Sequence, residues 1–208
     1  MLENILLLKG LTKTQLEKLE LAGKRRTYKK NNIILGKDDT SNYLFILLSG
    51  CVNAYVDEDE KRIIVNTITA EDSFGELAML SGEKRSANII AIEDCEVIIF
   101  QREDVYRLIE EVPEFSKNII QILAKKVNTL TEDVSSLALL DVYGRIARVI
   151  QQHIDSGSTG KLTQQDIADR VGSSREMVSR IFKDLRIGGY ISIEQKKISI
   201  LKPLPKAW

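Results

Sequence analysis

Short apolar runs separated by turns dominate the chain up to about residue 110. The runs span residues 32–35, 43–48, 52–56, 63–68, 87–92 and 96–100, and Gly36, Gly50, Gly75 and Gly82 fall between them. Strands of this length at such even spacing are typical of an all-β barrel or sandwich. A short helix is expected before them, over 11–21, because Leu16 and Leu19 repeat at helical spacing and Thr12 can cap its start.

A second pattern, with the period of a helix, begins at Pro113 and continues to Leu140. Its apolar side chains recur in alternating steps of three and four residues, at Ile120, Leu123, Val127, Leu130, Val134 and Leu137. This spacing is typical of a coiled-coil seam, and proline is tolerated in the first turn of a helix. The pattern predicts one long helix that joins two chains in a parallel homodimer. The alternative is a helix packed on its own domain.

Residues 141–208 combine short helices with a hairpin. Helices are expected over 142–154, over 163–171 with Thr163 as N-cap, and over 174–185 with Ser173 or Ser174 as N-cap and Gly188-Gly189 at the end. Apolar and polar residues then alternate over 190–193 and 197–201, around Glu194-Gln195-Lys196, which predicts two strands. Two short helices across a glycine turn, followed by such a hairpin, predict a winged helix-turn-helix.

The charge distribution separates the last third of the chain from the rest. Residues 141–208 carry 12 basic and 7 acidic side chains, whereas residues 1–140 carry 18 basic and 23 acidic ones. A basic segment joined to an acidic one indicates that only the last third meets a polyanion such as DNA. The alternative is an uneven surface without functional meaning.

The composition supplies little for metal or catalytic chemistry. The chain has two distant cysteines, Cys51 and Cys95, and one histidine, His153. This excludes a disulfide scaffold and a cysteine-based zinc site, and we expect neither a metal site nor catalysis with a cofactor. No stretch approaches the roughly 18 apolar residues of a membrane span, and the first residues lack the basic region of a signal peptide. We therefore expect a cytoplasmic protein that does not enter a membrane.

Three motifs in a fixed order resemble the CRP/FNR superfamily of transcription regulators, and most closely its cyclic-AMP receptor protein branch. Residues 74–80 followed by Arg85-Ser86-Ala87 are similar to the family's phosphate-binding cassette. Residues 137–148 resemble its hinge and first DNA-domain helix, and residues 172–180 resemble its recognition helix. The likeness covers nearly the whole chain.

The resemblance implies an α+β fold in three parts. Residues 1–112 would form a double-stranded β-helix, or jelly-roll, that binds a cyclic nucleotide. Residues 113–140 would form the dimerisation helix, and residues 141–208 the winged helix-turn-helix that binds DNA. Ligand binding would bias a two-state arrangement of the recognition helices about Leu140-Asp141-Val142.

Within the cassette, the resemblance implies a cyclic-nucleotide site that includes Gly75, Glu76, Leu77, Arg85, Ser86 and Ala87. The Glu76 carboxylate can accept a hydrogen bond from the ribose 2′-hydroxyl. The forked guanidinium of Arg85 can pair with the cyclic phosphate. The alternative is an ordinary pair between Glu76 and Arg85 across a surface loop.

The long helix departs from the family pattern near the nucleotide base. Leu130 and Thr131 stand where the cyclic-AMP receptor protein branch has adjacent Thr and Ser residues. Leu130 has no hydrogen-bonding group and completes the apolar seam, whereas Thr131 can still approach the base across the dimer. Cyclic AMP is the expected allosteric ligand, with cyclic GMP, another small molecule and a ligand-free active state as alternatives.

The helix over 174–185 carries the expected DNA-reading residues. By their match to the family, Arg175 and Arg180 can donate to guanine and Glu176 can accept from cytosine N4. Lys183 extends the basic face, and Thr163 and Gln165 can contact phosphate. The resemblance implies a two-fold symmetric site in double-stranded DNA with half-sites like TGTGA, and RNA polymerase as a further partner.

Other readings come from different function classes. The charged side chains of 174–185 can form a solvated helix face, with Glu176 and Arg180 as an ordinary pair four residues apart. The chain can also be a cyclic-nucleotide-binding regulatory subunit of an enzyme, although the winged helix-turn-helix argues against this. A catalytic role is not expected, because the sequence shows no nucleophile–base pair and no set of metal ligands.

Overall fold

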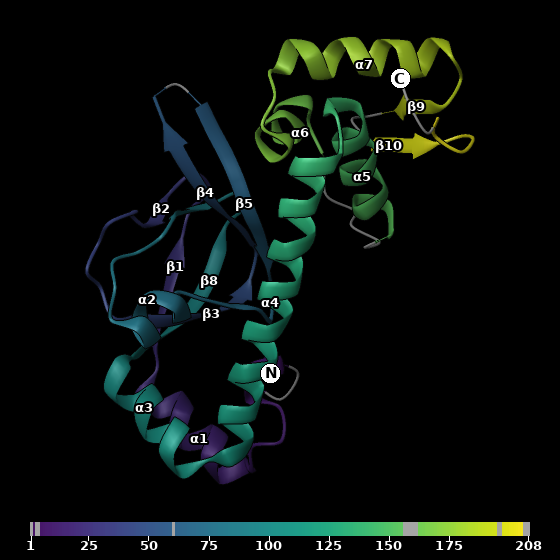
Figure 1. Ribbon diagram of the computed structural model, residues 1–208. Coiled ribbons are helices and arrows are strands. Elements are labelled where there is room, and N and C mark those ends of the chain that lie inside the picture. The colour runs from purple at the N-terminus through teal and green to yellow at the C-terminus, as the bar shows by residue number, and fades with distance from the viewer. Residues whose placement is uncertain (1, 3–4, 60, 156–161, 195–196, 206–208) are drawn as a thin grey trace. The chain divides into compact units, whose positions relative to one another are not determined.

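A computed structural model describes residues 2, 5–59, 61–155, 162–194 and 197–205 of the chain (Figure 1). The chain divides into two compact units. The first contains residues 1–56 and 65–128, and the second contains residues 57–64 and 129–208.

Antiparallel strands build most of the first unit. They are β1 (Lys24–Tyr28), β2 (Ile33–Leu35), β3 (Tyr43–Ser49), β4 (Cys51–Glu58), β5 (Lys61–Thr69), β6 (Ser73–Phe74), β7 (Asn88–Ala91) and β8 (Cys95–Gln101). They form two four-stranded sheets, ordered β1-β8-β3-β6 and β2-β7-β4-β5. Side chains from both sheets, such as Phe45 and Val97 of the first and Val52 and Ile89 of the second, share one buried core. The predicted β architecture is therefore confirmed, with β1 and β6 as additional strands at the two edges of the first sheet.

Helices close one end of this β domain. They are a short 3₁₀ helix (Leu6–Leu8), α1 (Lys13–Ala22), α2 (Glu76–Ser81), α3 (Arg102–Glu111) and the first turns of α4 (Pro113–Leu139). The side chain of Thr12 accepts a hydrogen bond from the Gln15 N–H, so the predicted cap of the first helix is confirmed. The sequence interpretation missed α2 and α3. Only Val105 of α3 is fully buried, so charged residues hide its helical period.

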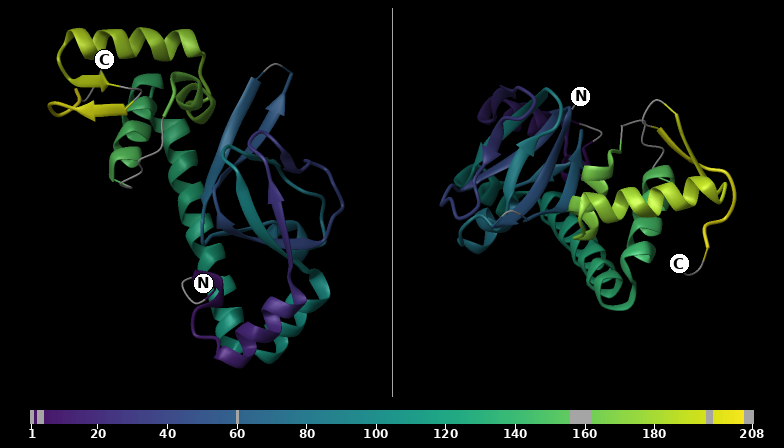
Figure 2. Two further views of the ribbon diagram at one scale, coloured as in Figure 1. Left: turned by 180° about the vertical axis from the view of Figure 1, so that it is seen from behind. Right: turned by 90° about the horizontal axis from the view of Figure 1, so that it is seen from above.

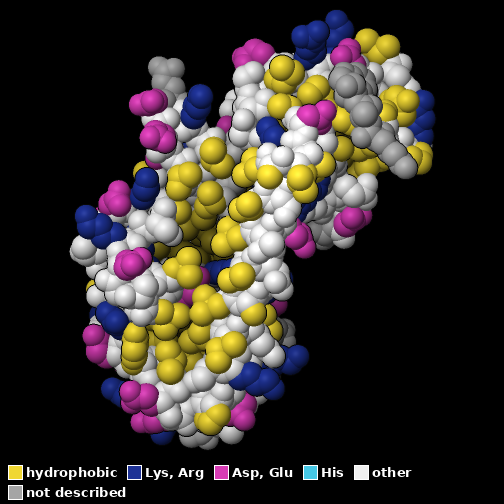
Figure 3. Space-filling model, viewed as in Figure 1, with side chains coloured by type: hydrophobic (Ala, Val, Ile, Leu, Met, Phe, Trp, Pro, Cys, Tyr) yellow, Lys and Arg dark blue, Asp and Glu magenta, His cyan; other side chains and the backbone are white. Residues whose placement is uncertain are grey.

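The long helix α4 was predicted correctly, and its apolar side chains fall into two groups. Near its start, Phe115 and Ile119 are buried in the core of the first unit, and Leu123 packs against the same core. The other seam side chains are 55–66% exposed in the single chain: Ile120, Val127, Leu130, Val134 and Leu137. Figure 3 shows hydrophobic side chains along this helix. Packing on its own domain therefore accounts for the start of the helix but not for the rest of the seam.

The second unit contains a helix-turn-helix with a wing. Its elements are α5 (Val142–Asp155), α6 (Gln164–Val171), α7 (Arg175–Ile187), β9 (Ile191–Glu194) and β10 (Lys197–Ile200). Figure 2 shows the hairpin of β9 and β10 next to α7. Residues 195–196 of the predicted turn lie outside the described residues. The predicted winged helix-turn-helix is confirmed, and α7 ends two residues later than expected.

Local capping and one buried core fix these helices. Thr163 caps α6 and Ser174 caps α7, each through a side-chain oxygen that accepts from a backbone N–H. Gly172 between them has a φ of 62°, a left-handed conformation that glycine adopts without steric cost. The apolar side chains of these helices are buried in one core: Ile146, Ile167, Val171, Val178, Ile181, Phe182 and Leu185. One face of α7 is therefore held inside the domain.

Candidate functional sites

The two residues of the predicted phosphate-binding cassette with charged side chains are both buried. Glu76 is the first residue of α2, and Arg85 lies in the loop between α2 and β7. Only 5% of Glu76 and 3% of Arg85 is exposed. A pair of charges on the surface of a loop, the alternative considered from the sequence, is therefore wrong. Charges are buried in proteins only when hydrogen bonds and opposite charges compensate them.

The Arg85 guanidinium is held by three oxygen atoms of the first unit. Its Nε donates to Ser41 Oγ at 3.1 Å, Nη1 to the Gly75 carbonyl at 2.5 Å, and Nη2 to the Tyr43 carbonyl at 2.9 Å. Burial lowers the pKa of Arg85, and the negative charges of Glu76 and Asp39 oppose this shift. These contacts tie the cassette to the edge of β3.

The Glu76 carboxylate has one satisfied and one unsatisfied oxygen. Its Oε1 accepts from Lys126 Nζ of α4 at 2.8 Å. Its Oε2 is buried and has no hydrogen-bond partner among the described residues. A cavity of about 10 Å³ has Glu76 and Ser73 in its lining, together with apolar side chains such as Leu44 and Met79. An unsatisfied buried acceptor is costly, so this oxygen is suited to a hydroxyl donor from a ligand or to a water molecule.

Lys126 was missed by the sequence reasoning. Fifty residues separate it from Glu76, and it lies next to the seam residue Val127 rather than in a recognisable motif. It is a charged position on the side of α4 that turns toward the β domain. The structure therefore adds a cation from the long helix to the predicted site.

The other predicted ligand-binding residues have different surroundings. Gly75 is half-buried and has a φ of 83°, the left-handed conformation from which α2 starts. Leu77 and Ser86 are exposed, and Ala87 is half-buried. Thr131 is exposed and belongs to the second unit, and its contact with a base stays a prediction.

The predicted DNA-reading side chains share the exposed face of α7. Arg175, Glu176, Arg180 and Lys183 are all exposed. Among the described residues, none of these four side chains has an ion-pair or hydrogen-bond partner. Glu176 and Arg180 therefore do not form an ordinary pair four residues apart. A face with two guanidinium groups, an ammonium group and one carboxylate offers the donors and the acceptor that base edges require.

The two predicted phosphate contacts of α6 already have partners in the free protein. The Thr163 hydroxyl donates to Asp166 Oδ2 at 2.6 Å and accepts from the Asp166 N–H at 3.1 Å. The Gln165 amide donates to Asp169 Oδ1 at 2.7 Å. A phosphate contact by either side chain would have to replace or add to these bonds.

Known domain families match both parts of the chain. A family model described as a cyclic nucleotide-binding domain matches residues 25–112, and one described as a Crp-like helix-turn-helix domain matches residues 144–204. The chain is 32% identical over 199 residues to the cAMP-activated global transcriptional regulator Vfr of Pseudomonas aeruginosa, covering 89% of this chain and 92% of Vfr. It is 33% identical to the cAMP-activated global transcriptional regulator CRP of Pasteurella multocida, covering 83% of this chain and 88% of that protein. The chain belongs to the CRP/FNR family of transcription regulators.

Solved structures share the fold of this CRP/FNR family member. The c-di-GMP-responsive global regulator CLP of Xanthomonas campestris superposes with a TM-score of 0.81 at 22% identity, covering 92% of this chain and 100% of CLP. A CooA mutant from Carboxydothermus hydrogenoformans superposes with a TM-score of 0.76 at 21% identity, covering 89% and 86%. The predicted α+β fold, with its cyclic-nucleotide-binding barrel, long helix and helix-turn-helix, is confirmed. None of the helices that the structure describes is long and apolar enough to cross a membrane.

The geometry at Gly75 predicts the effect of adding one methyl group. A Cβ at this position would lie 2.9 Å from both Arg85 Nη1 and the Tyr43 carbonyl oxygen, on a backbone with positive φ. We expect Gly75→Ala to displace Arg85 and to lower cyclic-nucleotide affinity by about tenfold or more, measured by calorimetry. Gly189→Ala is the control, because it has a similar φ of 67° but nothing within 4 Å of the added atom. Wild-type affinity in Gly75→Ala would contradict this account of the cassette.

Proposed function

We propose that this CRP/FNR family member is activated by cyclic AMP and binds a specific two-fold symmetric DNA site as a homodimer. The observation that carries the proposal is the buried Glu76–Arg85 cassette, in which Glu76 Oε2 has no hydrogen-bond partner among the described residues. Residues 1–112 would bind the ligand, 113–140 would join the two chains, and 141–208 would bind DNA and approach RNA polymerase.

The proposed ligand contacts use the hydrogen-bonding groups of the cassette that the chain itself leaves available. The ribose 2′-hydroxyl would donate to Glu76 Oε2 and remove the cost of an unsatisfied buried oxygen. A guanidinium carries five N–H donors, and the chain itself uses one on each nitrogen of Arg85, which leaves one N–H on each terminal nitrogen for the phosphate. Lys126 would add a second positive charge. Gly75, Leu77, Ser86 and Ala87 would line the site, and Thr131 would approach the base.

A different effector is the second candidate, and Leu130 is the observation that favours it. Its apolar side chain occupies a position where the cyclic-AMP receptor protein branch has a hydroxyl, which removes a hydrogen bond that could discriminate between bases. Cyclic GMP, another small molecule and a ligand-free active form are then the competing readings. A regulatory subunit of an enzyme would share the cassette, but the exposed DNA-reading face of α7 would have no role there.

Titration calorimetry of nucleotide-stripped protein tests the ligand. We expect cyclic AMP to bind at micromolar concentration and more tightly than cyclic GMP or cyclic di-GMP. Arg85→Leu should lower cyclic AMP affinity by an amount equivalent to about 2–5 kcal/mol, because it removes a buried charged partner of the phosphate. Lys18→Leu, on the exposed face of α1, is the control for a lost surface charge. If the wild-type protein binds none of the three nucleotides, the sensing part of the proposal is wrong.

The exposed seam of α4 is the proposed dimer interface. Its heptad spacing and its 55–66% exposure in the single chain both favour a second copy of the same helix as the occupant. Leu130→Lys would place two ammonium groups face to face in an apolar interface, so we expect the dimer to dissociate. Sedimentation velocity measures the change, with Lys125→Leu on an exposed position of the same helix as the control. A dimeric Leu130→Lys protein would place the interface elsewhere.

Substitutions on the exposed charged face of α7 are expected to weaken DNA binding in two different ways. Arg180→Ala should cost about 1–3 kcal/mol on a TGTGA-like site and relax the preference at one base pair. Lys183→Ala, if Lys183 contacts phosphate, should weaken binding to all sequences alike and reduce the salt dependence by about one ion. Selection from random DNA followed by anisotropy titrations separates the two. Recovery of no motif, or of an unrelated one, would show that these side chains form only a solvated helix face.

A further inference from the structure

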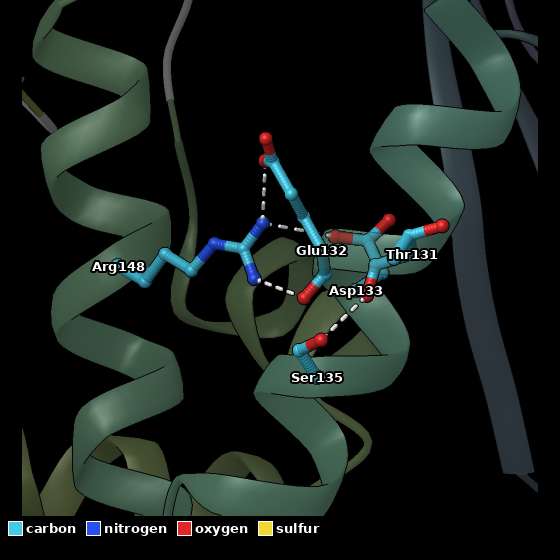
Figure 4. Close-up of polar contacts among 5 residues, drawn as sticks. All are labelled: Thr131, Glu132, Asp133, Ser135 and Arg148. Atoms are coloured by element: carbon cyan, nitrogen blue, oxygen red, sulfur yellow. Dashed lines mark hydrogen bonds and ion pairs between the residues drawn. The ribbon is translucent and has the colours of Figure 1, made fainter. Parts of the chain in front are cut away.

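Arg148 of α5 reaches back across the hinge to α4. Its Nη1 donates to the backbone carbonyl of Glu132 at 2.7 Å. Its Nη2 lies 3.2 Å from Glu132 Oε2 and 3.4 Å from Asp133 Oδ1 (Figure 4). Together, these contacts of Arg148 with Glu132 and Asp133 are called the hinge latch. They join helices separated in the chain by Leu140 and Asp141.

The hinge latch is more than a loose surface pair. Only 23% of the Arg148 side chain is exposed, whereas the side chains of Glu132 and Asp133 are 68% and 47% exposed. One guanidinium contacts a carbonyl and two carboxylates. Burial raises the pKa of Asp133, and the positive charge of Arg148 opposes that rise. Charge-assisted bonds that are partly shielded from water and shared by several groups are stronger than single exposed pairs.

Apolar packing contributes little at the same place. The buried side chains of α5, Tyr143, Ile146 and Ile150, belong to the core of the DNA-binding domain rather than to a contact with α4. Leu139, at the end of α4, is 82% exposed. A shallow, open hollow of about 410 Å³ lies beside Arg148, and its lining includes Ser135, Ser136, Leu139 and Leu140. The orientation of α5 on the end of α4 therefore depends on polar contacts.

A second arginine holds the hinge from the other side. Arg145 donates through Nη1 to the Leu140 carbonyl at 2.9 Å and through Nε to the Val171 carbonyl at 3.0 Å. It connects the hinge to the end of α6, entirely on the DNA-binding side. Arg148 differs because its partners lie on α4, two turns before the hinge. A conformational change in α4 would therefore form or break the contacts of Arg148.

We propose that Arg148 is a positioning residue whose hinge latch stabilises the arrangement of α5 on α4 that binds DNA, and so sets how strongly the ligand controls DNA binding. This arrangement has α4 helical through Leu139 and the reading face of α7 exposed. The carbonyl of Glu132 and the carboxylates of two successive residues face Arg148 together only while that turn is helical. The effect of ligand rests on the proposed function, because Thr131, the residue proposed to approach the base, directly precedes Glu132.

The hinge latch predicts that a substitution of Arg148 lowers DNA affinity, although Arg148 is not one of the proposed base-contacting residues. In the full-length protein, Arg148→Gln should bind its DNA about tenfold more weakly, because it breaks a coupled contact and shifts the hinge equilibrium. The probe is the duplex that the wild-type protein selects from random DNA, titrated by anisotropy with and without cyclic AMP. Lys18→Gln controls for the loss of one positive charge. Thermal melting should show that α5 and its core remain folded.

Substituting the acidic partners of Arg148 distinguishes an effect of the hinge latch on DNA affinity from a general effect of net charge. Glu132→Gln with Asp133→Asn deletes two negative charges, so electrostatics alone predicts equal or tighter binding to DNA. The latch predicts weaker binding. The charge-swapped pair, Arg148→Glu with Glu132→Arg, should recover part of the affinity that Arg148→Glu loses alone.

The outcomes separate this proposal from the proposed ligand. Two results would contradict the proposed role of the hinge latch. One is wild-type DNA affinity in Arg148→Gln, and the other is unchanged or tighter DNA binding in the variant with both Glu132→Gln and Asp133→Asn. Absence of cyclic AMP binding by the wild-type protein would instead overturn the proposed ligand, since the titrations without nucleotide still decide the latch.

Discussion

The cassette depends on burying one guanidinium without leaving it unsatisfied. Arg85 is inside the first unit, where a charge is stable only if protein atoms replace the water it loses. Three oxygen atoms do so: two come from Ser41 and Tyr43, just before and at the start of β3, and one is the carbonyl of Gly75. This requires the left-handed turn at Gly75, which in turn starts α2 and directs the Glu76 carboxylate inward. The geometry of the proposed ligand site is thus a consequence of how a single charge is compensated.

The long helix performs different tasks along its length because its surroundings change. Its first turns bury Phe115 and Ile119 and fix it to the β domain. Lys126 then completes the charge arrangement around Glu76. Farther on, its apolar seam is exposed, and its last turns meet α5 through polar contacts. This one helix therefore packs on the β domain, carries the exposed apolar seam and meets α5. Under the proposed function, it would couple the ligand, the partner chain and the DNA-binding domain.

In the DNA-binding domain, buried core residues and exposed charged side chains lie on opposite faces of α7. Val178, Ile181, Phe182 and Leu185 of α7 are buried, and the charged side chains of the other face are exposed. The capped helices and the left-handed Gly172 fix this orientation locally.

The sequence by itself determined the features that rest on neighbouring residues. The heptad of α4, the caps at Thr12 and Thr163 and the alternation in the wing are local patterns, because periodicity and capping act over a few positions. The family motifs located the cassette and the recognition helix. Only the tertiary structure decided which charged side chains are buried and paired. Lys126 and Glu76 are 50 residues apart, and Arg148 and Glu132 are 16 apart, so no local pattern distinguishes them from solvated surface charges. Their contacts exist because the topology brings distant segments together, and desolvation there makes each pairing matter.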